Sequence, residues 1–200
     1  MNQNFNLAIF ASGNGSNAEA IIRHFKNHES IHVSLVLTNN PNAFVLERAK
    51  QHNIEARIFN RLEYTHSQLV LEWMVERRIT HIVLAGFLWL IPDYLIKAYP
   101  NRIINIHPAL LPLHGGKGMY GMKVHEAVKN SGAAETGITI HLVNENYDEG
   151  TTLFQAKCTV DELCTPEHIA ERVHRLEHMH YPMVIEQWIK ESYPNFTTNQ

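Results

Sequence analysis

Cysteine is scarce in this sequence of 200 residues, in which Cys158 and Cys164 are the only two examples. They do not form a Cys-x-x-Cys pair, which argues against a disulfide framework and against a metal site built on thiolates. We therefore expect both to be small core or near-surface residues. A chain that uses so little cysteine fits the reducing cytoplasm.

Long apolar runs and an excess of positive charge are also missing. No apolar segment approaches the length of a membrane span, and the first residues lack the pattern of a signal peptide. The formal net charge of -3 provides no basic surface for nucleic acid. Neither a membrane nor a nucleic acid is expected as a partner, and the sequence does not specify an oligomeric state.

The composition that remains is that of a soluble globular protein, with 44% hydrophobic and 18% charged residues. A chain of this length favours one domain with a full sheet between two layers of helices. Apolar runs predict strands at residues 6–11, 33–37, 55–59, 81–87 and from residue 103. Helical spacing predicts helices at residues 18–25, 43–52 and 124–129, one long helix from Arg61, a helix with Pro92 in its first turn, and a last long helix capped by Thr165.

The last strands differ from the others in their pattern. Residues 137–143 alternate with period two, and residues 153–158 can pair with them as an antiparallel hairpin. The preceding βα units predict a mostly parallel sheet. We therefore predict an α/β fold in which a twisted, mostly parallel sheet is flanked by helices and an antiparallel hairpin comes late in the chain.

The apolar strand that begins at residue 103 ends by delivering two polar side chains to one place. Asn105 and His107 share one face of the strand, opposite the isoleucines that alternate with them, and Pro108 ends the strand. Ligands bind at the carboxyl edge of open α/β sheets, so this edge is a candidate site. Taken alone, the pair also fits an alternative without function, in which Asn105 is a core residue bonded to a nearby loop and His107 is a hydrogen-bonded histidine at the end of a strand.

A glycine-rich turn, Ser12-Gly13-Asn14-Gly15-Ser16-Asn17, joins the first strand to the first helix. Its glycines let the backbone approach a ligand, and the N–H groups of a helix N-terminus suit a phosphate. Ser16 or Asn17 is expected as the N-cap. The turn is neither Gly-x-Gly-x-x-Gly nor a P-loop, which favours one phosphate on a small ligand over a dinucleotide or triphosphate. A plain strand-to-helix connection is the alternative.

Two further segments can surround a site at this edge. The apolar segment Leu88-Trp89-Leu90-Ile91 fits either core packing or one wall of a pocket for a flat heterocycle. Four glycines between His114 and Met122 indicate a mobile loop over a site.

These segments, with Leu84-Ala85-Gly86-Phe87 and Tyr147-Asp148-Glu149-Gly150, follow an order that closely resembles the phosphoribosylglycinamide formyltransferase family. Its members are the folate-dependent glycinamide ribonucleotide transformylases of purine synthesis. The resemblance runs from about residue 6 to about residue 187. The motif from Asn105 to Pro112 is shared by several enzymes that use 10-formyltetrahydrofolate. The glycine-rich turn is specific to fewer of them, because it matches the site that takes the phosphate of the ribonucleotide. The resemblance implies a single Rossmann-like formyltransferase domain over residues 1–200.

The resemblance also implies a reaction, in which the formyl group of 10-formyltetrahydrofolate passes to the glycinamide amine of 5'-phosphoribosylglycinamide. Asn105 and a protonated His107 are then expected to donate to the oxygen that becomes negative during transfer. Asp148 is implied as the third catalytic residue, which raises the pKa of His107 and positions a water that relays the proton. No metal is expected.

The residues that hold the two small-molecule substrates are implied in the same way. The phosphate is expected at Gly13, Asn14, Gly15, Ser16 and Asn17, the ribose hydroxyls at Glu177, and the glycinamide beside Asn105. The folate is expected at Arg61, Leu88, Trp89, Leu90, Ile91, Asn144, Glu145, Asn146, Tyr147 and Asp148. His141 lies near this site and is assigned no role.

Two features depart from the family's pattern. Trp89 stands where many members carry a basic residue, which can alter contacts around the folate. The loop from His114 to Met122 is longer than the usual connection, which bears on contacts to the glycinamide substrate rather than on the chemistry.

Other functions fit less well. Methionyl-tRNA formyltransferase needs a further tRNA-binding domain and a basic surface. Formyltetrahydrofolate hydrolase normally adds an N-terminal regulatory domain, whereas here the first strand is expected near Asn6. A zinc module could use His174 and His178, spaced i, i+4, with His180 nearby, but a clear third ligand is missing. A regulatory protein without catalysis would not need the three catalytic residues together.

Overall fold

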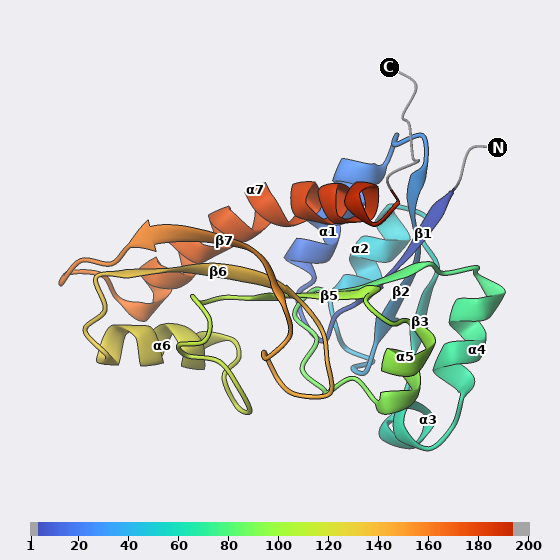
Figure 1. The fold of residues 1–200 in the computed structure, drawn as a ribbon, viewed down its shortest axis with the longest axis horizontal. Coiled ribbons are helices and arrows are strands. Elements are labelled where there is room, and N and C mark those ends of the chain that lie inside the picture. The colour runs from blue at the N-terminus through green and yellow to red at the C-terminus, as the bar shows by residue number, and fades with distance from the viewer. Residues whose placement is uncertain (1–3, 194–200) are drawn as a thin grey trace.

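The chain alternates strands and helices along most of its length, and the computed structural model describes residues 4–193 (Figure 1). The strands are β1 (Phe5–Phe10), β2 (Ile31–Thr38), β3 (Ala56–Ile58), β4 (His81–Leu84), β5 (Ile103–His107), β6 (Glu135–Leu142) and β7 (Thr152–Thr159). The helices are α1 (Ser16–Phe25), α2 (Val45–Gln51), α3 (Arg61–Thr65), α4 (Leu69–Glu76), α5 (Asp93–Ala98), α6 (Met122–Asn130) and α7 (Pro166–Ser192).

All seven strands form one sheet in the order β3-β2-β1-β4-β5-β6-β7. Neighbours from β3 to β5 pair in parallel, whereas β6 is antiparallel to both β5 and β7. The predicted α/β fold, with a mostly parallel sheet and a late antiparallel hairpin, is confirmed. The carboxyl ends of the parallel strands share one edge, where β4 and β5 lie side by side.

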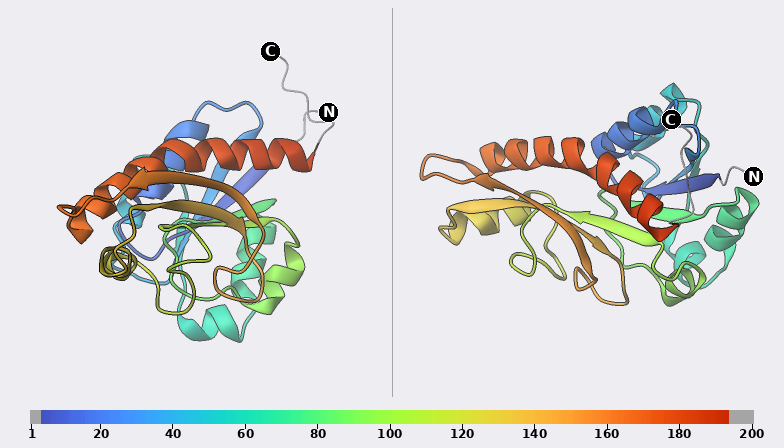
Figure 2. Two further views of the ribbon diagram at one scale, coloured as in Figure 1. Left: turned by 60° about the vertical axis from the view of Figure 1, so that its left-hand side comes forward. Right: turned by 45° about the horizontal axis from the view of Figure 1, so that its top comes forward.

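Two hydrophobic clusters cover the two faces of the sheet. Side chains of α1 and α7 fill the first cluster, and side chains of α4 and α5 fill the second. Figure 2 shows α7 running along one face beside α1 and over the hairpin. Ile104 and Ile106 belong to the first cluster and Ile103 to the second, so β5 alternates as predicted. Asn105 therefore projects from the face opposite α7.

The two cysteines are free thiols in the positions expected for them. Cys164 is buried, and Cys158 is half-buried. The Cys164 Sγ donates to Asp161 Oδ2 at 3.1 Å. Among residues 4–193, none of the helices combines the length and the apolarity that crossing a membrane requires.

The single long helix predicted from Arg61 is wrong, because the structure divides it into α3 and α4. The Thr65 and Ser67 hydroxyls donate to backbone carbonyl oxygens one turn back, at 2.8 and 2.7 Å. The Ser67 hydroxyl also accepts from the Leu69 N–H at 3.3 Å. Such side-chain bonds compete with the helical hydrogen bonds, and the chain turns between the two helices.

The strand predicted over residues 81–87 is too long, since β4 ends at Leu84. Gly86 has a φ of 73° and turns the chain out of the sheet. Pro92, expected in the first turn of the next helix, is instead the N-cap of α5, with an extended φ of -72° and ψ of 150°. The segment between these residues therefore lies along the sheet edge instead of extending the strand.

The last helix begins as predicted and is fixed firmly to the sheet. Thr165 accepts from the His168 N–H at 3.3 Å, and Pro166 takes the first helical position. Tyr181, farther along α7, is fully buried, and its hydroxyl lies 2.9 Å from the Leu84 carbonyl oxygen and 3.3 Å from that of Ile104. One phenol thus joins α7 to the last residue of β4 and to the second residue of β5.

His81 is the first residue of β4 and lies at the end of the sheet opposite the carboxyl edge. It is buried among aromatic rings. The rings of Trp188 and Phe5 lie 4.9 and 5.7 Å from its own. Its Nδ1 lies 2.9 Å from Thr80 Oγ1, and its Nε2 has no hydrogen-bond partner in the described part of the chain. Burial, with a contribution from the charge of Arg102, lowers the pKa of His81 to about 4.

We predict that a His81→Leu variant loses part of the acid sensitivity of the wild-type protein. In the unfolded chain this histidine takes up a proton near pH 6.5, while in the folded protein it stays neutral down to about pH 4. Unfolding therefore takes up a proton in this window, and the stability falls by about 3 kcal/mol as the pH falls through it. Urea unfolding of both proteins across this pH range measures the effect. The prediction would be contradicted if the free energy of unfolding changed with pH by the same amount in both proteins.

Candidate active site

Asn105 and His107 lie on one face of β5 at the carboxyl edge of the sheet. Asn105 is half-buried, and His107 is buried. In the antiparallel pairing with β6, Asn105 lies opposite His141, and His107 lies opposite Thr139. The Thr139 hydroxyl donates to the Ala109 carbonyl oxygen at 2.7 Å and holds the chain just after the strand. The β5–β6 register therefore determines which groups meet these two side chains.

The imidazole of His107 is held on both sides. Its Nδ1 lies 3.4 Å from Asp148 Oδ2, and its Nε2 lies 2.8 Å from the carbonyl oxygen of His114. Burial lowers the pKa of His107. Asp148 raises it, as the sequence predicts, but this effect is smaller than that of burial and the pKa stays below its ordinary value.

Asp148 lies in the loop after β6, where its φ of 57° is left-handed. Its Oδ2 accepts from the Gly116 N–H at 2.9 Å, and its Oδ1 lies 3.5 Å from His141 Nε2. Burial raises the pKa of this carboxyl, but the contact with His141, the charge of His107 and a backbone N–H together leave it lowered. The carboxylate therefore stays charged between two imidazoles.

His141, which the sequence places near the site without a role, is a member of this group. It is buried, with its Nδ1 2.8 Å from the Leu142 carbonyl oxygen and its Nε2 3.1 Å from Asn105 Nδ2. The alternation of residues 137–143 could have indicated a buried strand histidine. Only the β5–β6 register shows that this histidine faces a catalytic candidate.

The glycine-rich turn differs from the prediction at its cap. Gly15, with a φ of 75°, is the N-cap of α1, so the expectation of Ser16 or Asn17 at that position is wrong. A Cβ on Gly15 would lie 2.6 Å from side-chain atoms of Val45, the first residue of α2. The Val45 N–H donates to the Gly13 carbonyl oxygen at 3.2 Å. Close packing of α2, rather than side-chain capping, therefore determines the start of α1.

Arg48 of α2 holds the same turn from outside. Its Nε donates to the Asn14 carbonyl oxygen at 2.8 Å, and its Nη2 donates to Asn14 Oδ1 at 2.7 Å. The guanidinium also forms an ion pair with Glu19 of α1. One side chain thus joins the turn to both helices that flank it.

Glu177 of α7 is buried beside the turn. Its Oε2 accepts from Asn17 Nδ2 at 3.0 Å and lies 2.6 Å from His174 Nδ1. The hydrogen bond with Glu177 raises the pKa of His174 and outweighs the opposing effect of burial. Asn17 Oδ1 is buried and has no hydrogen-bond partner in the described structure. This cluster therefore contains an acceptor that protein atoms leave unpaired.

A cavity of about 690 Å³ connects these groups along the sheet edge. The predicted site residues that line it are Asn17, Leu88, Trp89, Leu90, Ile91, Asn105, His107, Asn146, Tyr147, Asp148 and Glu177. The predicted residues outside this lining are Gly13, Asn14, Gly15, Ser16, Arg61, Asn144 and Glu145. Three histidines that the sequence did not select also line the cavity, namely His125, His141 and His174.

The apolar segment after β4 forms one wall of this cavity. The Trp89 ring lies 5.6 Å from the Tyr64 ring, and the Arg61 guanidinium lies 4.7 Å from the centre of the Trp89 ring. The Leu88 N–H donates to Ser12 Oγ at 3.1 Å, while the Leu88 side chain is 45% exposed. A segment fixed in this way, with an exposed leucine, favours a pocket wall over simple core packing.

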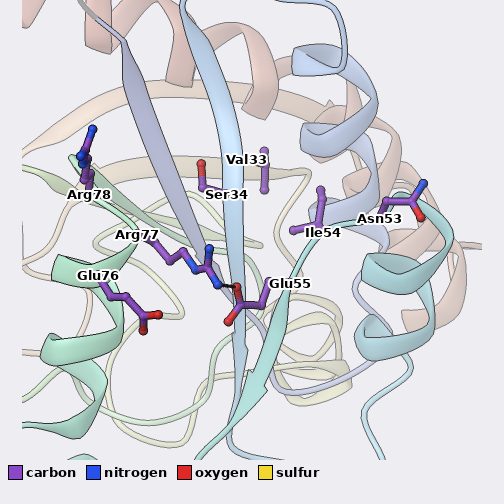
Figure 3. Close-up of a pocket in the computed structure, with 8 residues that line it drawn as sticks. All are labelled: Val33, Ser34, Asn53, Ile54, Glu55, Glu76, Arg77 and Arg78. Carbon is purple, nitrogen blue, oxygen red and sulfur yellow. Dashed lines mark ion pairs between the residues drawn. The ribbon is translucent and has the colours of Figure 1, made fainter.

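A second hollow, of about 470 Å³, lies near the amino ends of β3 and β4 (Figure 3). Figure 3 shows Arg77 and Glu55 pointing toward one another, and these two residues form an ion pair. Glu55 also pairs with Arg57. Glu55 and Arg77 of this hollow therefore neutralise one another, and the cavity at the carboxyl edge, which most of the predicted site residues line, is the better candidate for an active site.

The zinc alternative can be compared with the positions of the histidines. Within residues 4–193, no group of three or more histidine, cysteine, aspartate or glutamate side chains is arranged to hold a metal ion. The His174 and His178 rings stack with their centres 5.9 Å apart, and His174 is bonded to Glu177. His174 therefore belongs to the hydrogen-bonded surroundings of Glu177, and His178 stacks on His174.

Curated relatives match most of this chain. A family model described as Formyl transferase matches residues 5–185. The phosphoribosylglycinamide formyltransferase of Bacillus subtilis is 39% identical over 186 residues, which cover 90% of this chain and 93% of that protein. The chloroplastic phosphoribosylglycinamide formyltransferase of Arabidopsis thaliana is 41% identical over 192 residues. That match covers 90% of this chain but 63% of the plant protein, which is less than two thirds of its length.

Solved structures show the same similarity. The phosphoribosylglycinamide formyltransferase of Bacillus halodurans matches with a TM-score of 0.84 and 33% identity, over 96% of this chain and 100% of that one. Glycinamide ribonucleotide transformylase 1 of Geobacillus kaustophilus matches with a TM-score of 0.83 and 35% identity, over 91% and 97% of the two chains. The resemblance and the enzyme class predicted from the sequence are confirmed by these matches. The chain therefore belongs to the formyl transferase family.

Proposed function

We propose that this protein transfers the formyl group of 10-formyltetrahydrofolate to the glycinamide amine of 5'-phosphoribosylglycinamide in purine biosynthesis. The observation that carries the proposal is the meeting of Asn105, His107 and Asp148 at one cavity. That cavity also reaches the glycine-rich turn through Asn17 and has an apolar wall. The names of the relatives from Bacillus subtilis and Arabidopsis thaliana support the same substrate.

Asn105 and His107 supply the hydrogen-bond donors for the transfer step. The amine nitrogen attacks the formyl carbon, and negative charge develops on the formyl oxygen. The amide N–H of Asn105 and an N–H of protonated His107 stabilise that oxygen. One donor of this kind typically contributes about 3–4 kcal/mol of transition-state stabilisation.

Nε2 is the nitrogen of His107 that donates, because Nδ1 faces Asp148. In the structure, Nε2 contacts the carbonyl oxygen of His114. The loop from His114 to Met122 therefore has to withdraw this oxygen when the substrates bind. The glycines of the loop suit such a movement.

Asp148 organises the transfer of the proton. The attacking amine loses a proton, and N10 of the folate gains one as its bond to the formyl carbon breaks. The charged carboxylate beside His107 can hold the water that carries this proton. The same charge favours the protonated form of His107.

The remaining assignments rest on the resemblance to the family, and of these groups Asn17, Asn105, Glu177 and residues 88–91 line the cavity. The turn of residues 13–17 binds the phosphate through the first N–H groups of α1, Glu177 accepts from the ribose hydroxyls, and Asn105 lies beside the glycinamide. The folate takes the wall of residues 88–91, the loop of residues 144–148 and Arg61. The protein acts as a single formyltransferase domain over residues 1–200, in the cytoplasm and without a metal.

Removing either His107 or Asp148 should greatly slow formyl transfer. We expect His107→Ala and Asp148→Asn each to lower kcat by about 10²–10³-fold, because a transition-state donor or its proton relay is lost. Formation of formylated ribonucleotide from 10-formyltetrahydrofolate and 5'-phosphoribosylglycinamide measures the effect. Lys97→Ala, on the exposed side of α5, serves as the matched control and should keep wild-type turnover.

Two results with the wild-type protein would contradict the proposed function. Release of formate without transfer would indicate a hydrolase. Binding of the ribonucleotide with no turnover would indicate a regulatory protein that kept only the phosphate site.

The Asp148→Asn variant should also move the base-side limb of the pH–rate profile to lower pH. Burial already lowers the pKa of His107, and Asp148 is the largest opposing influence. Loss of the carboxylate lowers this pKa further, so the protonated, working form of His107 disappears at a lower pH. NMR titration of the His107 ring measures the shift directly. An unchanged or higher His107 pKa in the variant would argue against this role of Asp148.

Gly15→Ala should weaken the binding of the ribonucleotide rather than that of the folate. The added methyl group would meet Val45 at 2.6 Å in a left-handed backbone, so the turn has to move. We expect the KM for the ribonucleotide to rise by about 10-fold or more and the stability to fall by about 1–2 kcal/mol. Gly13→Ala has no heavy atom within 4 Å of its new Cβ and should unfold like the wild type. Equal losses of stability in both variants would show that the packing of α2 is not responsible.

A further inference from the structure

His141 connects the residues proposed to carry out catalysis. It is buried, and the β5–β6 register sets it directly opposite Asn105. The pairing of β6 with β7 shifts its register at this point, because Ile140 pairs with Phe154 and His141 pairs with Thr152. The ladder with β7 is therefore irregular beside His141, whereas the ladder with β5 is regular.

The two ring nitrogens of His141 have partners of opposite kinds. Nδ1 lies 2.8 Å from the carbonyl oxygen of Leu142, which can only accept, so Nδ1 carries a proton. In neutral His141 the lone pair then lies on Nε2, which is 3.1 Å from the amide nitrogen of Asn105, a donor. Both contacts therefore agree on the same tautomer, with the proton on Nδ1.

Asp148 competes with Asn105 for the same ring nitrogen. Its Oδ1 lies 3.5 Å from His141 Nε2, and a carboxylate oxygen needs a proton on that nitrogen to form a hydrogen bond. Nε2 cannot accept from Asn105 and donate to Asp148 at the same time. Neutral His141 thus holds the Asn105 amide, whereas protonated His141 pairs with Asp148 and releases it.

We propose that His141 is a positioning residue, which in its neutral form fixes the Asn105 amide with its second N–H directed at the formyl oxygen. This inference rests on the proposed formyl transfer and adds to it a residue that acts through Asn105. Because the amide is planar, one hydrogen held by His141 determines the direction of the other. Donation to the oxyanion matters mainly in the transition state, so loss of this hold lowers kcat and leaves substrate binding intact.

Two substitutions of different chemistry test the role. His141→Leu removes the acceptor at similar bulk, whereas His141→Gln keeps an acceptor oxygen. We expect kcat to fall by about 30- to 100-fold in His141→Leu and to recover by about 10-fold in His141→Gln, while both KM values stay within about twofold of the wild type. His81→Leu removes another buried strand histidine at the opposite end of the sheet, and it should keep the wild-type kcat.

A double-mutant cycle separates positioning from general structural support. In an Asn105→Ala background, His141→Leu should cost little further activity, because the group that it positions is already absent. The proposal would be overturned if the loss of kcat in the double variant equalled the product of the losses in the two single variants. A raised KM with an unchanged kcat in His141→Leu would overturn it as well.

Nitrogen NMR of the imidazole rings tests the geometry without turnover. Neutral His141 should carry its proton on Nδ1. In the Asn105→Ala variant, the Nε2 resonance of His141 should shift toward the position of an imidazole nitrogen that accepts no hydrogen bond. A proton on Nε2 in the neutral ring would overturn the positioning role even in a fully active enzyme. Absence of transfer by the wild-type protein would instead refute the proposed function, and with it this role, whatever the tautomer.

Discussion

The antiparallel pairing of β5 with β6 is the constraint on which the site depends. It sets His141 opposite Asn105 and Thr139 opposite His107, and it leads β6 into the loop that carries Asp148. A slip of one residue would turn the polar side chains of β5 toward α7, because strand side chains alternate. A parallel sheet that ends in an antiparallel hairpin thus brings two oppositely directed strands to one edge (Figure 1).

Features that depend on neighbouring residues could be predicted from the sequence. Apolar runs located the strands, and the alternation before Pro108 set Asn105 and His107 on one face. Thr165 and Pro166 marked the start of α7 because capping is a property of adjacent residues. Resemblance to a family then supplied Asp148, which lies beside His107 in the structure although it is distant in the sequence.

Features that depend on packing between distant segments could not be predicted. Gly15 is the N-cap of α1 because α2 packs against the turn, although Ser16 and Asn17 are the better capping types. The contact between Asn17 and Glu177 joins opposite ends of the chain. The role of His141 depends on strand register, which its own sequence pattern does not contain.

A crystal structure with 5'-phosphoribosylglycinamide and a formyl-folate analogue, in which carbon replaces N10, tests the proposed chemistry most directly. We predict that the formyl oxygen lies within about 3.2 Å of Asn105 Nδ2 and His107 Nε2, with the His114 carbonyl oxygen withdrawn from the imidazole. A formyl oxygen bound away from both donors, with the contact between His107 and His114 intact, would contradict it.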